Sequence, residues 1–129
     1  MKNINVALLG FGTVGSGVAE AIRKNSKIME DSIGCHFTIS HVLVRHPEKY
    51  RDMDLLQGIH LTSSFDDIIA DSSIDIIIEV MGGIHPAKEY IFEALNHHIN
   101  VVSANKDLVA LFGPENHAYC HGKPCKLQL

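Results

Sequence analysis

With 129 residues, of which 46% are hydrophobic, the chain is long enough to bury the core of one domain and leaves no room for a second. Its net charge of -4 at pH 7 offers no basic surface for nucleic acid, and no window approaches the roughly 18 consecutive apolar residues of a membrane helix. The three cysteines, in a chain that shows no export signal, argue against a disulfide framework, so we expect a cytoplasmic protein with reduced thiols.

The first predicted elements are a strand over residues 3–9 and a helix that begins near Thr13. They are joined by a G-x-G-x-x-G pattern, which between a strand and a helix predicts a dinucleotide site. Gly10 would allow the tight turn, Gly12 would let the backbone approach a pyrophosphate, and Gly15 would let the helix pack closely on the strand. The helix would present unpaired N–H groups and the positive end of its dipole to the phosphates.

A polar segment and a second strand follow. Residues 25–34 are polar and end at Gly34, so we expect the first helix to fray there into a loop. The β-branched and apolar residues of 37–44 predict a strand, which stops at Arg45-His46-Pro47 because proline cannot continue the pairing. Arg45 is therefore expected at the carboxyl end of this strand.

Strands and helices alternate through the second half of the chain. After a charged segment at residues 47–58, the pattern predicts strands over residues 59–62, 74–80 and 99–103, and helices over residues 65–70, 86–98 and 105–111. The nearly continuous apolar run of 74–80 is typical of a strand covered on both faces. Residues 114–129 show no periodic apolar face, and we expect them to form an irregular tail.

This alternation predicts an α/β fold, a Rossmann-type doubly wound parallel sheet that forms a single domain over residues 1–113. Ligands bind such a sheet beyond the carboxyl ends of its strands. Four features are expected to meet at that edge, namely the glycine turn, Arg45, Met81-Gly82-Gly83 and Ser103-Ala104-Asn105-Lys106.

Arg45 bears on the choice of cofactor. An acidic side chain at the end of the second strand usually binds the ribose hydroxyls of NAD, whereas a guanidinium suits the 2′-phosphate of NADP. We therefore predict NADP, with NAD still possible, and expect that Lys49 and Arg51 could assist. The alternative is that Arg45 is a solvated charge at a strand end.

Three further positions have two interpretations each. Gly82 and Gly83 would let the chain pass close to the nicotinamide or its ribose, or they are an ordinary pair of loop glycines. Lys106 would bond the nicotinamide end of the cofactor or a substrate carbonyl oxygen, or it is a solvated surface lysine. Glu79 lies in an apolar strand, so it either meets a hydrogen-bond donor or titrates upward, and we favour a structural hydrogen bond.

The histidines and cysteines do not predict a metal site. His97 and His98 are adjacent on a helix and cannot point the same way. The zinc-type residues of the tail match no paired-knuckle spacing. They are His117, Cys120, His121 and Cys125.

Three stretches resemble the cofactor half of homoserine dehydrogenase: GFGTVGSGV at 10–18, EVMGGIHPA at 79–87 and VVSANK at 101–106. The resemblance covers about residues 3–113, and it implies NADP-linked interconversion of L-homoserine and L-aspartate 4-semialdehyde on the route to threonine and methionine. It implies that Lys106 is the active-site lysine beside the nicotinamide. The cofactor contacts expected from the motifs and the resemblance together are Gly10, Phe11, Gly12, Thr13, Val14, Gly15, Ser16, Gly17, Arg45, Gly82, Gly83, Ser103 and Lys106.

The resemblance also implies parts that this sequence lacks. Members of that family continue into a substrate-binding and dimerisation domain, which supplies an acidic homoserine contact and a second lysine as proton donor, and full-length relatives are expected to be homo-oligomers. We therefore expect a truncated or frameshifted product, or a boundary chosen for expression, that binds NADPH weakly and turns over slowly or not at all. One alternative is a glucose–fructose oxidoreductase-like dehydrogenase, whose usual E-K-P differs from Asn105-Lys106-Asp107; another is a non-catalytic nucleotide-binding module.

Overall fold

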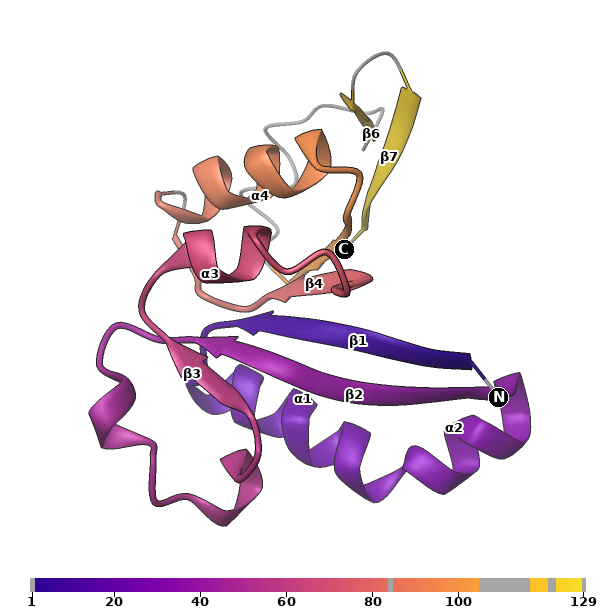
Figure 1. Ribbon diagram of the computed structural model, residues 1–129, viewed down its shortest axis with the longest axis vertical. Coiled ribbons are helices and arrows are strands. Elements are labelled where there is room, and N and C mark those ends of the chain that lie inside the picture. The colour runs from indigo at the N-terminus through magenta and orange to yellow at the C-terminus, as the bar shows by residue number, and fades with distance from the viewer. Residues whose placement is uncertain (1, 84, 105–116, 121–122, 129) are drawn as a thin grey trace.

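The computed structural model describes residues 2–83, 85–104, 117–120 and 123–128. Its strands are β1 (Lys2–Leu9), β2 (Cys35–Leu43), β3 (His60–Thr62), β4 (Ile76–Glu79), β5 (Asn100–Ser103), β6 (His117–Cys120) and β7 (Lys123–Gln128). They form one sheet in the order β3-β2-β1-β4-β5-β7-β6 (Figure 1). Every neighbouring pair is parallel except β6 with β7.

Helices cover both faces of the sheet. They are α1 (Thr13–Lys24), α2 (Ser26–Ile33), α3 (Phe65–Ile69) and α4 (Ala87–Asn96), with short 3-10 turns η1 (Pro47–Lys49) and η2 (Asp54–Leu56). α1 and α2 lie on one side, and α3 and α4 lie on the other (Figure 1). A parallel sheet between two helix layers confirms the predicted doubly wound α/β class.

Each face buries its own apolar cluster. The cluster between the sheet and helices α3 and α4 includes Ile77 and Leu95, which have almost no exposed surface. The cluster on the side of α1 includes Leu8, which is also fully buried. Successive residues of β1 alternate between the two clusters, because side chains of a strand point to opposite faces. Burying one side chain of this size stabilises the fold by about 1.5–3 kcal/mol, so the strands hold both helix layers in place.

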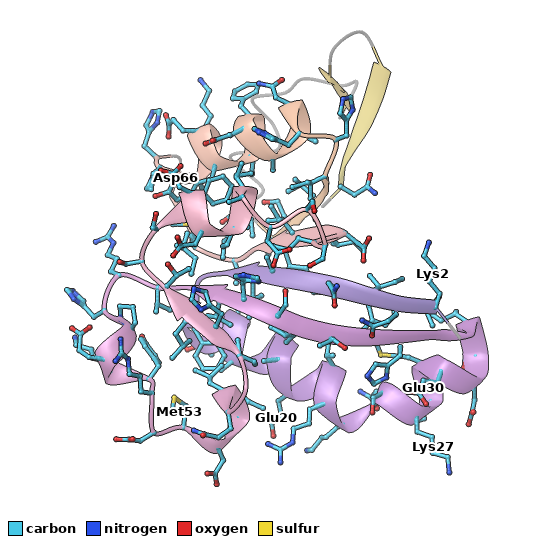
Figure 2. All side chains as sticks on the ribbon, viewed as in Figure 1. Lys2, Glu20, Lys27, Glu30, Met53 and Asp66 are labelled. Carbon is cyan, nitrogen blue, oxygen red and sulfur yellow. The ribbon has the colours of Figure 1, made fainter. Side chains whose placement is uncertain are left out.

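Several charged side chains of the helices point away from the sheet. In Figure 2, Glu20 and Lys27 project away from α1 and α2, and Asp66 projects from α3, and all three are exposed. Lys24 and Glu20 approach to 3.7 Å across one turn of α1, but an exposed pair of this kind contributes little. Apolar burial therefore determines how the layers pack.

Helix α1 comes closest to the sheet at Gly15. A Cβ added there would lie 2.5 Å from the carbonyl oxygen of Gly10 and 3.2 Å from Cγ2 of Val80. This contact confirms the role predicted for Gly15, since only a residue without a side chain fits between the helix and the strand ends. Gly17, two residues further along α1, has nothing within 4 Å of the same added atom.

Most predicted elements are present with shifted ends. The strands expected at residues 3–9, 37–44, 59–62, 74–80 and 99–103 correspond to β1 to β5, and the helices expected from Thr13, at 65–70 and at 86–98 correspond to α1, α3 and α4. The helix expected at residues 105–111 lies outside the described residues.

The prediction of a loop over residues 25–34 is wrong, because α2 occupies most of it. α2 has only eight residues, most of them polar, and buries none of them, so its few apolar residues do not repeat over several turns as those of a longer helix do. Gly34, expected to close a loop, instead ends α2 in the left-handed conformation with φ 69°.

The irregular tail expected at residues 114–129 is also wrong in part, because β6 and β7 lie within it. β7 pairs with β5 through Val101 and Val102, and β6 pairs with β7. Such pairing uses backbone groups, which any sequence carries, so the tail can extend the sheet without a periodic apolar face.

Replacing the two glycines of α1 should separate packing from propensity. We expect Gly15→Ala to lower the free energy of unfolding by about 1–3 kcal/mol, since the new methyl group meets rigid backbone. The matched control Gly17→Ala should be neutral or stabilising by up to about 1 kcal/mol, because its methyl group points into open space within a helix. Urea unfolding measures both, and equal effects would contradict the packing role of Gly15.

Candidate functional site

The glycine turn connects β1 to α1 at the carboxyl edge of the sheet. Gly10 has φ 101°, a conformation that residues with a side chain rarely adopt, and its N–H donates to the carbonyl oxygen of Leu43 at 2.9 Å. A Cβ on Gly10 would also press against the backbone of Val80 at 3.2 Å. The tight turn predicted for Gly10 is therefore confirmed, and β2 and β4 both pack against it.

Gly12 presents the opposite situation, because an added Cβ would meet nothing within 4 Å. It stands at the N-terminus of α1, where its carbonyl oxygen accepts the first helical bond, from the N–H of Ser16 at 2.9 Å. The first N–H groups of a helix have no acceptor within the helix and favour an anion. The backbone at Gly12 is therefore open to solvent, and a side chain at this position would fill the space beside it. This open space next to the helix N-terminus suits a phosphate.

The other predicted contacts of this motif share the first turns of α1. Thr13, Val14 and Gly17 are exposed, and Val14 retains 55% of its surface despite being apolar. Ser16 donates its hydroxyl to the carbonyl oxygen of Thr13 at 3.1 Å. Val14 is the member of this group that a bound ligand could cover with a gain in apolar burial.

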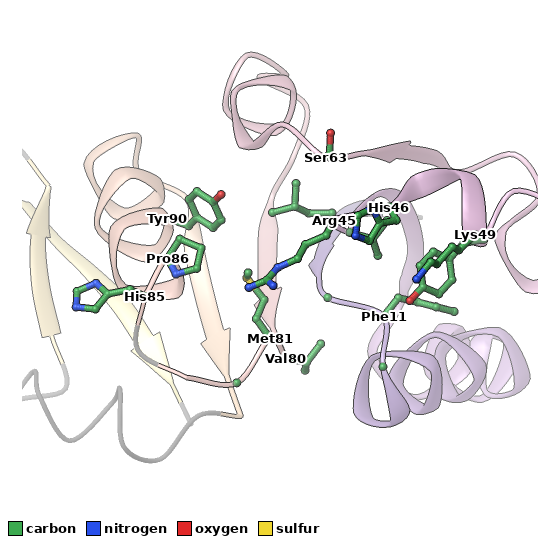
Figure 3. A pocket seen from close by; sticks show the side chains of 16 residues that line it. Phe11, Arg45, His46, Lys49, Ser63, Val80, Met81, His85, Pro86 and Tyr90 are labelled. Carbon is green, nitrogen blue, oxygen red and sulfur yellow. The ribbon is translucent and has the colours of Figure 1, made fainter.

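A cavity of about 410 Å³ opens beside this turn, across the carboxyl ends of β1, β2 and β4. Figure 3 shows its labelled lining side chains coming from the glycine turn, from the segments after β2, β3 and β4, and from the start of α4. The structure thus brings together Gly10, Phe11, Gly12, Arg45 and Gly82 of the predicted set. A volume of this size fits part of a dinucleotide.

The charge of the cavity is one-sided. Arg45, Lys49 and two histidines line it, and no aspartate or glutamate is among its described lining residues. In Figure 3 the guanidinium of Arg45 extends across the cavity toward Met81. Arg51, which was expected to assist, is not in the lining, whereas Lys49 is. The wall therefore offers cations and hydrogen-bond donors to an anionic ligand.

The loop after β4 forms the facing wall. Gly82 and Gly83 have φ values of 77° and 73°, so this loop needs residues that tolerate the left-handed region. Gly82 and Met81 line the cavity, while Gly83 lies beyond the lining. An added Cβ at either glycine would meet nothing within 4 Å, so the backbone here is open to a ligand.

Glu79, the last residue of β4, is fully buried. One carboxylate oxygen, Oε2, accepts the backbone N–H of Met81 at 2.7 Å, and the other, Oε1, accepts the hydroxyl of Ser103 at 2.6 Å. The structural hydrogen-bonding role predicted for Glu79 is confirmed. Ser103 is also fully buried and does not line the cavity, so its hydroxyl faces Glu79 rather than the ligand space.

Lys106, the predicted catalytic residue, lies outside the described residues. The last described residue before it is Ala104, whose N–H donates to the backbone oxygen of Glu79 at 3.1 Å. The position of Lys106 relative to the cavity stays a prediction.

Several lining residues were not predicted from the sequence. Tyr50 meets Phe11 edge to face with ring centroids 5.8 Å apart, which packs η1 against the glycine turn. Tyr90 of α4 stacks on Phe65 of α3 at 4.4 Å. His85 is bonded to Glu89 one turn ahead. These aromatic residues are spread over three segments, and only the i, i+4 spacing of His85 and Glu89 is visible in the sequence.

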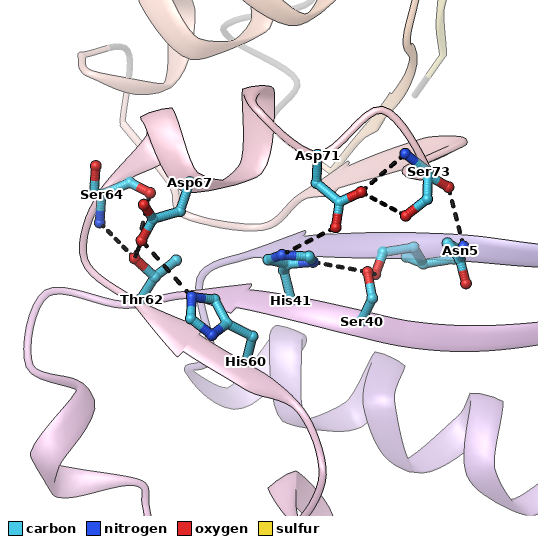
Figure 4. Close-up of polar contacts among 10 residues, drawn as sticks. Asn5, Ser40, His41, His60, Thr62, Ser64, Asp67, Asp71 and Ser73 are labelled. Carbon is cyan, nitrogen blue, oxygen red and sulfur yellow. Dashed lines mark hydrogen bonds and ion pairs between the residues drawn. The ribbon is translucent and has the colours of Figure 1, made fainter.

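A cluster of polar side chains lies away from the cavity, between β2, β3 and α3 (Figure 4). The rings of His41 and His60 lie 5.2 Å apart, and Nε2 of His41 is 3.6 Å from Oδ2 of Asp71. Burial lowers the pKa of His41 below its ordinary value of 6.5, with Asp71 opposing this shift and His60 adding to it.

Hydroxyl groups hold the two aspartates of this cluster in their charged form. The hydroxyl of Thr62 donates to Asp67 at 2.6 Å and lowers the pKa of that carboxyl. The side chain and backbone of Ser73 both donate to Asp71 and lower its pKa as well. This polar cluster connects β2 to α3 and the turn behind it.

Among the described residues, no set of three or more histidine, cysteine, aspartate or glutamate side chains is placed to hold a metal ion. None of the helices described there is long and apolar enough to cross a membrane.

Comparison with known proteins bears on this site. Residues 10–117 match the sequence profile of a family described as "Homoserine dehydrogenase, NAD binding domain". The chain is 45% identical to homoserine dehydrogenase of Bacillus subtilis over an alignment of 115 residues. The alignment covers 89% of this chain and 26% of that protein. The chain therefore spans about a quarter of the length of the curated relatives it matches.

Solved structures give the same result. A homoserine dehydrogenase from S. aureus superimposes with a TM-score of 0.79 at 45% identity, over 86% of this chain and 28% of that one. A homoserine dehydrogenase from Thiobacillus denitrificans superimposes with a TM-score of 0.79 at 38% identity, over 89% of this chain and 26% of that one.

The burial of His41 predicts a pH dependence of stability. The unfolded chain takes up a proton near pH 6.5, whereas folded His41 resists protonation, so the free energy of unfolding should fall as the pH drops below that value. We expect His41→Asn to lose stability overall but to show a shallower decline between about pH 8 and about pH 5.5. Urea unfolding at several pH values measures the decline. His97→Gln, at an exposed position, controls for the loss of a histidine, and an unchanged decline in His41→Asn would contradict the prediction.

Proposed function

The chain belongs to the homoserine dehydrogenase family, and on that premise we propose that it is the cofactor-binding part of an NADP-linked oxidoreductase that interconverts L-homoserine and L-aspartate 4-semialdehyde. The proposal includes a cytoplasmic setting on the route to threonine and methionine and homo-oligomers for the full-length relatives. The membership rests on a profile that covers most of this chain; the reaction, as a property of the whole enzyme, is the proposed part.

The observation that carries the choice of NADP is the cationic wall at the end of β2. Arg45 and Lys49 line the cavity, and no carboxylate is among its described lining residues to bind the two ribose hydroxyls of NAD. A 2′-phosphate would accept charge-assisted hydrogen bonds from the guanidinium and would gain from the nearby ammonium. NAD would leave both cations unpaired, so the wall favours NADP.

The residues of the glycine turn fit the rest of the cofactor. Open backbone at Gly12 and the N-terminus of α1 would take the pyrophosphate, and Gly10 and Gly15 keep that helix end in place. Gly82 and Gly83 would leave room for the nicotinamide ribose along the loop after β4. The nicotinamide, when bound, would donate or accept the hydride.

We assign the polar step of the reaction to Lys106. An ammonium beside the substrate carbonyl would stabilise negative charge as it develops on the oxygen during reduction. Ser103 donates its hydroxyl to Glu79, and its expected contact with the cofactor stays a prediction. The remaining contacts with homoserine would come from parts of the full-length relatives that this chain does not span.

Binding measurements on this chain test the cofactor assignment. We expect Arg45→Ala to weaken NADPH binding by about 10- to 100-fold, because a charge-assisted bond to the 2′-phosphate is lost, and to leave NADH binding within about threefold. Fluorescence titration with both cofactors gives the two dissociation constants.

Arg51→Ala is the matched control, since Arg51 lies six residues further along and outside the cavity lining. It should leave both affinities within about twofold, the loss expected from distant charge alone. Equal weakening of NADPH and NADH by Arg45→Ala, or tighter binding of NADH by the unaltered chain, would overturn the assignment of NADP.

A further inference from the structure

We propose that Glu79 is a positioning residue that fixes the cavity wall after β4 relative to the end of β5. This inference rests on the proposed function of the cavity. Glu79 is buried and does not line the cavity, so it would act through the backbone that it holds.

Glu79 stands where two hydrogen-bond ladders end. The N–H of Val80 still donates to Leu9 of β1 at 2.9 Å, but the next N–H, that of Met81, has left the ladder and donates to the Glu79 carboxylate at 2.7 Å. Glu79 therefore supplies the acceptor for the first N–H of the loop beyond the sheet. That loop begins the cavity wall, because Met81 and Gly82 line it.

The same residue holds the end of β5. Glu79 is paired with Ser103 in the parallel register, its Oε1 accepts the Ser103 hydroxyl at 2.6 Å, and its backbone oxygen accepts the N–H of Ala104 at 3.1 Å. Ala104 is two residues before Lys106 in the sequence. Three hydrogen bonds from one residue thus connect the cavity wall to the segment that leads to the proposed catalytic lysine.

The loop after β4 continues with two glycines. Gly82 and Gly83 are exposed, and a Cβ added at either would meet nothing within 4 Å. Because glycines are conformationally free, the bond to Met81 restricts the loop at its first residue. A carboxylate is suited to this position because it offers an acceptor to each of two donors, which no apolar side chain could do.

Substitutions of Glu79 and of its partner Ser103 test this role. Glu79→Leu removes both acceptors, Glu79→Gln keeps one, and Ser103→Ala removes one donor. In Glu79→Gln the amide oxygen can still accept from Met81 while its NH2 group faces the hydroxyl, which can rotate to accept. We therefore expect the effect of Gln to lie between those of Glu and Leu. If Leu prevents folding, the other two variants still decide.

Asp75→Asn is the matched control. Asp75 directly precedes β4 at the opposite edge of the sheet, where its carboxylate accepts the N–H of Asn5 at 2.9 Å. This variant also removes a carboxylate that anchors the same strand. It should affect stability without affecting the cavity.

The decisive quantity is the dissociation constant of 2′-phospho-ADP-ribose divided by that of NADPH. The first ligand lacks the nicotinamide, so the ratio measures what the nicotinamide half contributes, whatever happens at the adenosine end. We expect the ratio to fall by about fivefold in Ser103→Ala, as for loss of one buried hydrogen bond, to fall by less in Glu79→Gln, where the bond to Ser103 is reversed, and to stay unchanged in Asp75→Asn. Hydrogen exchange should become faster at Met81 and Ala104 and stay the same at Gly10.

The outcomes separate the two proposals. If the unaltered chain binds neither ligand, the proposed function fails, and the exchange rates at Met81 and Ala104 alone decide whether Glu79 couples the loops. If it binds both, an unchanged ratio in Glu79→Gln and Ser103→Ala overturns the positioning role. A fall of the same size in Asp75→Asn also overturns it, because general loss of stability would then explain the effect.

Discussion

The close approach of α1 to the ends of β1 and β4 is the contact on which the site depends. It exists because Gly15 has no side chain to hold the helix away from Gly10 and Val80. This approach places the N-terminus of α1 beside the open backbone of Gly12. The turn at Gly10 is also bonded to β2, because the N–H of Gly10 donates to the carbonyl oxygen of Leu43. A helix held further out would direct the same N–H groups at solvent, where water would satisfy them.

The sequence predicted the parts of this arrangement that local rules determine. A glycine turn between an apolar strand and a helix has a steric meaning at each position, and the apolar run of β4 was recognisable because burial on both faces demands apolar residues. α2 was missed because it is short, mostly polar and buries none of its residues. β6 and β7 were missed because strands of four and six residues join the sheet through backbone pairing, which leaves no periodic apolar pattern to read.

The site shows the same division. Arg45 could be assigned to the cavity because a strand end in a parallel sheet has a known edge, and the structure agrees. Tyr50 and Tyr90 could not, since they reach the cavity by packing on Phe11 and Phe65, which are distant in sequence. Glu79 was recognisable as a charged residue in an apolar strand, but its bond to Ser103 depends on the register between β4 and β5, which no single segment encodes.

Charges are sorted by position in this domain, and the sorting has a physical reason. The two carboxyl oxygens of buried Glu79 accept an N–H and a hydroxyl of the protein itself, so this side chain serves as an internal acceptor. Arg45 and Lys49 are exposed at the rim, where their charges remain available to a ligand. Glu79 could not exchange places with them: a carboxylate at the rim would repel phosphate, and a cationic side chain in place of Glu79 could not accept the N–H of Met81. The same edge of the sheet can therefore bind an anionic cofactor and still keep its own loops hydrogen-bonded.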